Sequence, residues 1–564
     1  MISHGAFLHL LEAPTMNTAH TDTFVHDHLP LEHLQPEFIF ELPELEFPAH
    51  INCAAELLDK AIAKGWGSRP CIQSATVSWT YQELLDKANQ MAHVLTQELG
   101  LVSGNRVLLR STNTPEMVAA WFAVVKAGGI AVATMPLLRS YELQQIIDKA
   151  LVSHAICDFA LREELIKAQS DCKTQSLKHL SFFRSQGHTL ETKGLKAQSE
   201  FHLLDTAAER HPRAFQNFES LATDCCILAF TSGTTGVPKA TIHSHRDVMS
   251  ICACWPPSVL RPQDSDVFIG SPPLAFTFGL GGLVLFPMSV GASVALLEKA
   301  SPKDLIVGIE KYQATVLFTA PTSYRQLALE GLVSPQSSLR KCVSAGEALP
   351  AATRTLWREA TGIEIIDGIG TTEMLHIFIS AKEEDSLAGA TGKVVKGYKA
   401  CILDDEGCEL PPGQVGHLAV KGPTGCRYLS DERQLKYVKN GWNITGDAYL
   451  MDERGYFHYQ SRTDDMIISS GYNISGPEIE ACLLAHEMVA ECAVIGEPDE
   501  ARGSIVKAFV VLKDPHKAGE SIVQVLQDHV KTLLAPYKYP RKIQFVPSLP
   551  KTQTGKIQRF KLRQ

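Results

Sequence analysis

Hydroxyl, glycine and lysine residues are concentrated in one short segment that follows an apolar run ending at Phe230. Glycines let backbone N–H groups approach phosphate oxygens, hydroxyl groups add donors, and Lys239 adds a positive charge. The segment therefore predicts a phosphate-binding loop, but not a Walker A loop, which needs Gly-Lys-Ser/Thr at a fixed spacing. A surface loop rich in serine and threonine is the alternative. The predicted loop residues are Thr231, Ser232, Gly233, Thr234, Thr235, Gly236 and Lys239.

Five further motifs follow this loop along the chain. They are Ser344-Ala345-Gly346-Glu347, Gly368 to Glu373, Ile444 to Asp447, Ser461 to Asp465, and Pro550 to Lys556. Together with the loop, these motifs and their order resemble the adenylate-forming superfamily, which contains acyl- and aryl-CoA ligases, luciferases and peptide-synthetase adenylation domains. The resemblance covers residues 50–564, and Ser461 stands where the family usually has glycine.

The resemblance implies a fold of the α/β and α+β classes. We expect a large N-terminal domain of parallel and mixed sheets with helices and a β-barrel-like part, followed by a small, mobile α+β domain. The expected boundaries are an extension at 1–49 that packs on the large domain, the large AMP-binding domain at 50–462, and the small domain at 463–564. Asp464 matches the family's hinge, where a few residues absorb a domain rotation.

The resemblance also implies roles for single residues, with Lys556, Glu373 and Lys239 as the catalytic ones. Glu373 would bind Mg²⁺, because carboxylate oxygens suit this hard cation. Asp447 would accept hydrogen bonds from the ribose hydroxyls, and Arg462 would donate to ribose or phosphate. Lys556 would stabilise charge that develops on the carboxylate and the transferring phosphate. Further expected ATP or AMP contacts are Ser344, Ala345, Gly346, Glu347, Asp367, Gly368, Ile369, Gly370, Thr371 and Thr372.

The acid pocket is expected beside the motif that contains Glu373. Residues 373–376, Glu-Met-Leu-His, resemble the benzoate and 2-aminobenzoate branch of aryl-CoA ligases. Phe276 and Phe278 can wall a flat ring, and His376 can donate to the carboxylate or to an ortho substituent. Core phenylalanines with a satisfied buried histidine are the alternative. The expected pocket residues are Phe276, Thr277, Phe278, Gly279, Gly370, His376 and Ile377.

These assignments predict an ATP-dependent aryl-CoA ligase with Mg²⁺ as cofactor and with ATP, CoA and a small aromatic acid as substrates. Residues 22–24, 42–45 and 52–55 look more like the 2-aminobenzoate members than the benzoate members. Ser470, Gly471 and Tyr472 would line the CoA tunnel after domain rotation, since glycine permits close approach. The alternatives are a stand-alone enzyme that loads a carrier protein, a ligase for medium-chain or other acids, and a non-catalytic binding protein on this fold.

The elements that position these residues have local signals of their own. Residues 106–110 and 130–134 read as strands, and Thr114-Pro115 starts a helix between them. Such a strand–helix–strand order predicts a parallel sheet. Residues 447–458 predict a hairpin, and 477–484, 490–495 and 507–512 predict a helix and two strands. The uncharged stretch 267–297 contains too many prolines and glycines for one membrane-spanning helix, so we expect a strand, a loop, a helix and a strand.

Composition narrows the class of protein. With 564 residues, a net charge of −9 and 45% hydrophobic residues, the chain is neither a typical disordered chain nor a typical nucleic-acid binder. The 14 cysteines include no CxxC pair, so we expect reduced thiols in a cytoplasmic protein. The N-terminus lacks the basic start of a signal peptide, and Met16 is an alternative start. We expect no binding to nucleic acid and no insertion into a membrane. A homodimer is one oligomeric state that the sequence allows.

A second histidine-containing segment, His243-Ser-His245, follows the phosphate loop. A metal site would need further ligands, and the sequence places none beside these two histidines. We therefore expect a structural role for both.

Overall fold

In the computed structural model, the strand–helix–strand unit predicted from residues 106–134 forms at the predicted positions. This structure describes residues 18–185, 202–231, 238–469, 472–499, 503–534, 538–551 and 557–563. β3 (Arg106–Arg110), α4 (Pro115–Lys126) and β4 (Ile130–Thr134) confirm the predicted strand–helix–strand unit. The Thr114 hydroxyl caps α4 by accepting a hydrogen bond from the Met117 backbone N–H at 3.2 Å.

One six-stranded sheet of the large domain has the order β6-β5-β3-β4-β7-β8. Its strands run parallel except β8, which is antiparallel to β7. The phosphate-loop segment connects these two strands, and Thr231 pairs with Lys239 across its base. The remaining strands are β5 (His154–Asp158), β6 (His179–Phe183), β7 (Cys225–Thr231) and β8 (Lys239–Ser244). The helices of this part are α3 (Tyr81–His93), α5 (Ser140–Ala150), α6 (Arg162–Asp171), α7 (Leu204–Ala208) and α8 (His245–Trp255).

A second sheet has nine strands in the order β15-β14-β13-β12-β11-β9-β10-β1-β2. Its strands are β1 (Pro70–Gln73), β2 (Ser78–Thr80), β9 (Val267–Gly270), β10 (Ser293–Ala295), β11 (Val316–Thr319), β12 (Lys341–Ala345), β13 (Ile365–Gly370), β14 (Ile377–Ser380) and β15 (Lys393–Val394). The central strands from β9 to β13 are parallel, so their carboxyl ends meet at one edge. Ligands bind at such an edge in open α/β sheets.

Helices connect the strands of this second sheet. They are α9 (Thr277–Leu280), α10 (Phe286–Val290), α11 (Pro302–Tyr312), α12 (Pro321–Leu329) and α13 (Ala351–Thr361). The stretch 267–297 forms β9, the α9–α10 helical segment and β10, as predicted. In the part of the chain that the structure describes, no helix combines the length and apolar character needed to cross a membrane.

An antiparallel five-stranded sheet completes the large domain. It contains β16 (Lys399–Leu403), β17 (Val415–Lys421), β18 (Val438–Lys439), β19 (Trp442–Met451) and β20 (Phe457–Arg462), with α14 (Gln434–Tyr437) beside it. The predicted hairpin is β19–β20, with Gly455 at a φ of 79° in its turn. The pairings among these described strands do not close into a ring, so the expected barrel-like part is an open sheet.

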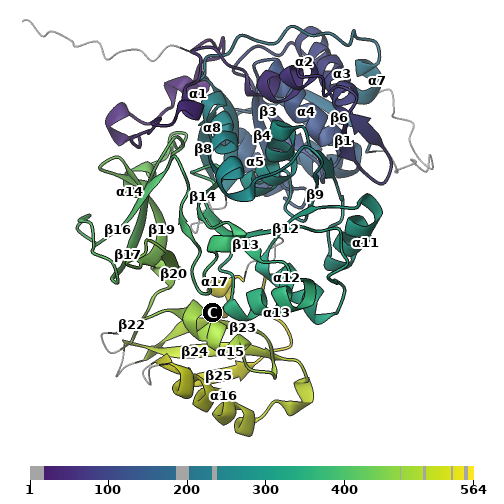
Figure 1. The fold of residues 1–564 in the computed structure, drawn as a ribbon. Helices are drawn as coiled ribbons and strands as arrows, with labels where there is room; N and C mark the ends of the chain where they lie inside the picture. The colour runs from purple at the N-terminus through teal and green to yellow at the C-terminus, as the bar shows by residue number, and fades with distance from the viewer. Residues whose placement is uncertain are drawn as a thin grey trace, which may run out of the picture.

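The C-terminal part is a smaller α+β unit that lies below α12 and α13 in Figure 1. It contains β21 (Ile467–Ser469), β22 (Tyr472–Ile474), α15 (Gly476–Leu484), β23 (Val489–Asp499), β24 (Gly503–Leu512), α16 (Glu520–Leu533), β25 (Lys542–Phe545) and α17 (Arg559–Leu562). The predicted helix starts one residue earlier than expected, and both predicted strands are longer. They extend because β23 and β24 pair along nearly their whole length. The predicted mixed α/β fold with a large and a small domain is confirmed.

The described part of the N-terminal extension lies against the large domain. Asp22 forms an ion pair with Arg106 of β3, and Phe38 forms a β-bridge with Gly422. Lys399 contacts Glu41 at 2.6 Å. The extension contains the short helix α1 (Phe24–Asp27), and α2 (Lys60–Ala63) follows near the start of the large domain.

Candidate active site

Lys239 and Glu373, predicted from separate motifs, form a direct ion pair. Lys239 Nζ donates to Glu373 Oε1 at 2.7 Å and to the hydroxyl of Tyr428 at 2.6 Å. The Tyr428 hydroxyl in turn donates to Glu373 Oε1. Lys239 is the first residue of β8 and Glu373 follows β13, so the two sheets of the large domain meet at this point.

The surroundings of Glu373 keep its carboxyl ionised. Burial alone would raise its pKa, but the positive charge of Lys239 and the hydrogen bonds from Lys239 and Tyr428 hold the pKa below its usual value. Both side-chain donors bond to Oε1, so Oε2 accepts from neither of them. A buried carboxylate with an oxygen outside this pair suits a Mg²⁺ ligand.

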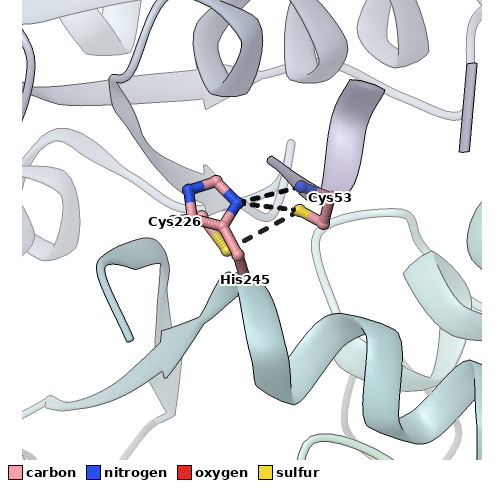
Figure 2. A group of neighbouring side chains, drawn as sticks. All are labelled: Cys53, Cys226 and His245. Carbon is pink, nitrogen blue, oxygen red and sulfur yellow. Dashed lines mark hydrogen bonds between the residues drawn. The ribbon is translucent and has the colours of Figure 1, made fainter. Parts of the chain in front are cut away.

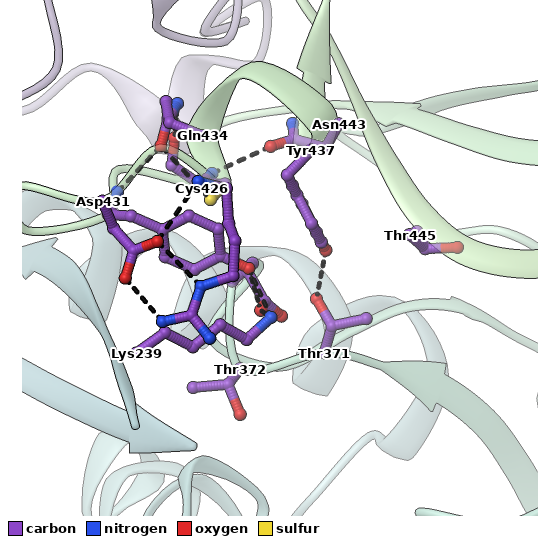
Figure 3. A network of polar contacts seen from close by, with 12 residues as sticks. Lys239, Thr371, Thr372, Cys426, Asp431, Gln434, Tyr437, Asn443 and Thr445 are labelled. Atoms are coloured by element: carbon purple, nitrogen blue, oxygen red, sulfur yellow. Dashed lines mark hydrogen bonds and ion pairs between the residues drawn. The ribbon is translucent and has the colours of Figure 1, made fainter. Parts of the chain in front are cut away.

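A second group of side chains fixes the loop before Glu373. The hydroxyls of Thr371 and Tyr437 lie 3.2 Å apart (Figure 3). His243 Nε2 donates to the Thr372 carbonyl at 2.8 Å. The Lys239 ammonium lies 5.7 Å from the centre of the Tyr437 ring. Burial lowers the pKa of His243 to about 4, so its imidazole is neutral at pH 7. This arrangement supports the structural role expected for His243.

The predicted adenine-side residues meet at the carboxyl ends of β12 and β13. Ser344 pairs with Asp367 and Ala345 pairs with Gly368 in parallel register. Gly346 follows with a φ of 92°, a conformation that favours glycine. At Gly370 a Cβ would lie 2.6 Å from the His376 carbonyl oxygen, so this strand end can approach its neighbour only without a side chain. Glu347 is half-buried beside them, and Ile369 lies between the two glycines of β13.

Asp367 predicts a pH dependence of stability. Burial raises the pKa of this carboxyl from its ordinary 3.8 to about 7, so between these two values the folded state holds a proton that the unfolded chain releases. The associated stability is present below the lower value and is lost as pH rises towards the upper one. The Tm of Asp367→Asn should therefore rise relative to that of the wild type as pH increases from 4 to 7. Calorimetry checks this, with the exposed Glu359→Gln as control. Parallel curves for wild type and Asp367→Asn would contradict it.

The predicted ribose residues also lie together. Asp447 in β19 pairs with Arg462 in β20, and Arg462 Nη1 donates to Asp447 Oδ1 at 3.1 Å. Gly446 adopts a φ of 78°, and a Cβ there would lie 3.0 Å from Arg462 Nη2. Asp464 lies in the short 3₁₀ turn Thr463–Asp465 directly after this hairpin. The turn therefore joins the ribose residues to the small domain.

Several predicted residues fall outside the described part of the chain. Thr231 is the last described residue before the phosphate loop, and the segment 232–237 lies outside. Ser470 and Gly471 also lie outside, between Ser469 and Tyr472, which pair in the β21–β22 hairpin. Lys556 lies outside as well. Their roles stay predictions.

The structure brings Phe278 and His376 together but places Phe276 elsewhere. The ring centres of Phe278 and His376 are 5.8 Å apart. Phe276 and Thr277 instead line a small apolar cavity against β4 and β7, together with Trp121. Residues two apart at the start of a helix point in different directions, which explains the separation. Gly279 is buried in α9, and Ile377 is buried at the start of β14, where it pairs with Gly370.

An aromatic cluster that the sequence did not predict surrounds His376. The ring centre of His376 lies 4.4 Å from that of Phe286 and 5.7 Å from that of Trp255. The Phe318 ring lies next to Phe278, tilted by 49°, with a centre distance of 5.5 Å. Burial lowers the pKa of His376 to about 3, so the imidazole is neutral. A neutral imidazole can donate from one nitrogen and accept at the other.

Comparison with known proteins decides the family. Residues 59–428 match the family described as AMP-binding enzyme, and residues 478–556 match the AMP-binding enzyme C-terminal domain. The chain belongs to this family. This confirms the predicted membership of the adenylate-forming superfamily.

Relatives of this AMP-binding enzyme include aryl-CoA ligases. Benzoate–CoA ligase from Thauera aromatica is 34% identical over 92% of this chain and 97% of its own length. The anthranilate CoA ligase AuaEII, in complex with anthranoyl-AMP, superposes with a TM-score of 0.86 at 34% identity, covering 93% of this chain and 98% of that chain. A benzoate CoA ligase from Burkholderia xenovorans LB400 superposes with a TM-score of 0.81 at 30% identity, covering 91% and 100%. The protein is an AMP-forming acyl- or aryl-CoA ligase.

His245 of the AMP-binding enzyme belongs to a buried cluster with Cys53 and Cys226 (Figure 2). The Nδ1 atom of His245 lies 3.2 Å from Cys53 Sγ, and the two sulfur atoms lie 3.9 Å apart. Among the described residues no fourth histidine, cysteine or carboxylate completes a tetrahedral set. His245 Nδ1 already accepts a hydrogen bond from the Cys53 backbone N–H at 3.1 Å. These hydrogen bonds join β7, α8 and the segment around Cys53, which fits the structural role expected for His245.

Proposed function

We propose that the chain activates an aromatic acid of the benzoate or 2-aminobenzoate type with ATP and transfers the aryl group to CoA. The observation that supports an aromatic acid is the buried cluster of rings around His376. This histidine follows Glu373 by three residues, so the cluster adjoins the ion pair with Lys239. A flat ring packs favourably in offset or edge-to-face contact with such side chains.

In the first half-reaction, a carboxylate oxygen of the acid attacks the α-phosphorus of ATP, and the bond to the bridging oxygen breaks to release pyrophosphate. Lys239 would bind phosphate, and its partner Glu373 would bind Mg²⁺, which would supply positive charge to the phosphate oxygens. Asp447 would accept hydrogen bonds from the ribose hydroxyls. Lys556 would add charge stabilisation from the small domain.

In the second half-reaction, the CoA thiolate attacks the acyl carbon, and AMP leaves with the electrons of the broken acyl–oxygen bond. We propose that the small domain rotates at Asp464 between the two steps, so that Ser470, Gly471 and Tyr472 line the thiol's path. The 3₁₀ turn after β20 supports this hinge position. Two alternatives from the sequence analysis share the first half-reaction. A carrier-loading enzyme would transfer the acyl group to a carrier protein in place of CoA, and a medium-chain ligase would activate a different acid.

The pocket assignment predicts a change in acid binding for His376→Ala. The KM for the aromatic acid should rise about tenfold, which corresponds to about 1.4 kcal/mol of lost contact, while the KM for ATP stays within about twofold. Steady-state pyrophosphate release checks this, with the exposed His516→Ala as control. A rise in the KM for ATP alone would contradict the pocket assignment.

A screen of acids tests the proposed substrate class. The purified chain is assayed for pyrophosphate release with benzoate, 2-aminobenzoate, hydroxybenzoates, phenylacetate and medium-chain acids, each with CoA or with carrier proteins as acceptor. We expect the highest kcat/KM for benzoate or 2-aminobenzoate, with CoA as the better acceptor. A preference for medium-chain acids or for a carrier protein would favour the corresponding alternative. No release with any acid would favour a non-catalytic binding protein.

A further inference from the structure

Arg325 on α12 of the large domain reaches across to the small domain. Its Nε donates to the Ala490 carbonyl at 3.2 Å, and its Nη2 lies 3.3 Å from the Val489 carbonyl and 3.4 Å from the Leu484 carbonyl. These three carbonyls flank the turn between α15 and β23. Figure 1 shows α12 and α13 directly beside α15 and β23, and α13 also contacts α15.

The chemistry of this contact suits a guanidinium group. Leu484 is the last residue of α15, and carbonyls in the last turn of a helix lack partners within the helix. They also carry the negative end of the helix dipole, which a cation stabilises. Arg325 is half-buried, so its side chain is packed at the domain boundary and does not extend freely into water. Its planar fork of donors contacts three carbonyls at once.

The contact depends on the relative orientation of the domains. Arg325 precedes the 3₁₀ turn that contains Asp464 by more than a hundred residues, and its acceptors lie beyond that turn. Rotation of the small domain about this turn would separate the guanidinium from the three carbonyls. By contrast, the hydrogen bond from Ser475 Oγ to the Gln460 carbonyl spans only the linker region. The Arg325 contact therefore stabilises one orientation of the two domains. Contacts within a single domain are the same in every orientation and stabilise none of them selectively.

We propose that Arg325 is a positioning residue that holds the small domain in the adenylate-forming orientation and thereby sets the balance between the two half-reactions. AuaEII bound to anthranoyl-AMP superposes over 93% of the chain with a TM-score of 0.86, a global fit that supports a domain orientation like that of an adenylate complex. The inference rests on the proposed two-step function. Removing contacts made in only one orientation shifts the population towards the other.

The kinetic test separates the two half-reactions in the full-length protein. Arg325→Ala should slow single-turnover formation of aryl-AMP about tenfold, within the usual range of about 5- to 150-fold for such couplings. Thioester formation from supplied aryl-AMP and CoA should stay unchanged or become faster. The control is Arg358→Ala on α13, whose side chain is 60% exposed and lies 3.9 Å from Glu364. Equal losses in both steps, or no loss in either, would overturn the proposal.

A second measurement does not depend on catalysis, so it separates failure of this proposal from failure of the proposed function. Cys408 is exposed and all other cysteines are buried, so a spin label on Cys408 marks the large domain. Ser521→Cys on α16 supplies an exposed labelling position in the small domain. Without substrates, the label-to-label distance distribution should be narrow with Arg325 and should gain a second population in Arg325→Ala. Identical distributions would overturn the proposal even if the wild type makes aryl-CoA.

Discussion

Replacing Glu373 by glutamine should lower the rate of acid-dependent pyrophosphate formation by about 10²- to 10³-fold, the usual cost of losing a group that stabilises developing charge. Glutamine keeps the size of the side chain and an oxygen that can accept the hydrogen bonds from Lys239 and Tyr428. It removes the negative charge that suits a Mg²⁺ ligand. The Mg²⁺ concentration needed for half-maximal rate should rise as well.

The measurement for Glu373→Gln is pyrophosphate release over a Mg²⁺ titration, accompanied by calorimetry to show that the variant is folded. Glu359→Gln on the exposed face of α13 is the matched control and should behave as the wild type. A rate within threefold of the wild type with an unchanged Mg²⁺ dependence would show that Glu373 only neutralises Lys239.

Lys556→Ala should abolish most adenylate formation while sparing thioester formation. A lysine that contacts the carboxylate and phosphate in one domain orientation stabilises only the step that occurs there, so we expect a loss of about 10²-fold or more in aryl-AMP formation. Thioester formation from supplied aryl-AMP should change by less than about threefold, because the Lys556 contact is absent from that step.

The control for this variant is a lysine of the same C-terminal segment. Lys551 forms an ion pair with Glu491 at 2.7 Å on the surface of the small domain, and Lys551→Ala removes a charge without touching the site. Rapid-quench measurement of the two half-reactions decides the outcome. Equal losses in both steps for Lys556→Ala would refute the two-orientation mechanism.

Sequence reasoning succeeded where the signal is local. Thr114-Pro115 places the start of α4, because a capping hydroxyl and a proline at the first helical position act within one turn. Gly455 places the β19–β20 turn for the same reason. The ends of β23 and β24 were missed, because a strand ends where its partner ends, and pairing partners are not encoded in a strand's own residues.

The same limit applies to the site. Lys239 and Glu373 belong to motifs of the family, so their meeting followed from the resemblance. Tyr428 was missed, since it lies 189 residues from Lys239 and stands in no motif with a chemical signature. Phe276 and Phe278 were both predicted to wall the aromatic ring, and the structure places Phe278 beside His376 and Phe276 at the small cavity near Trp121, because side-chain direction differs at the start of α9. Arg325 was missed because only the folded domains bring it to the end of α15.

A single-turnover quench experiment tests whether the chain makes aryl-CoA through an aryl-AMP intermediate. The protein is mixed with ATP, Mg²⁺ and benzoate or 2-aminobenzoate, quenched, and analysed by mass spectrometry before and after CoA is added. We predict aryl-AMP and pyrophosphate in equal amounts before CoA, and conversion of the aryl-AMP to aryl-CoA and AMP afterwards. Formation of ADP and phosphate, or of aryl-CoA without any aryl-AMP, would contradict the account.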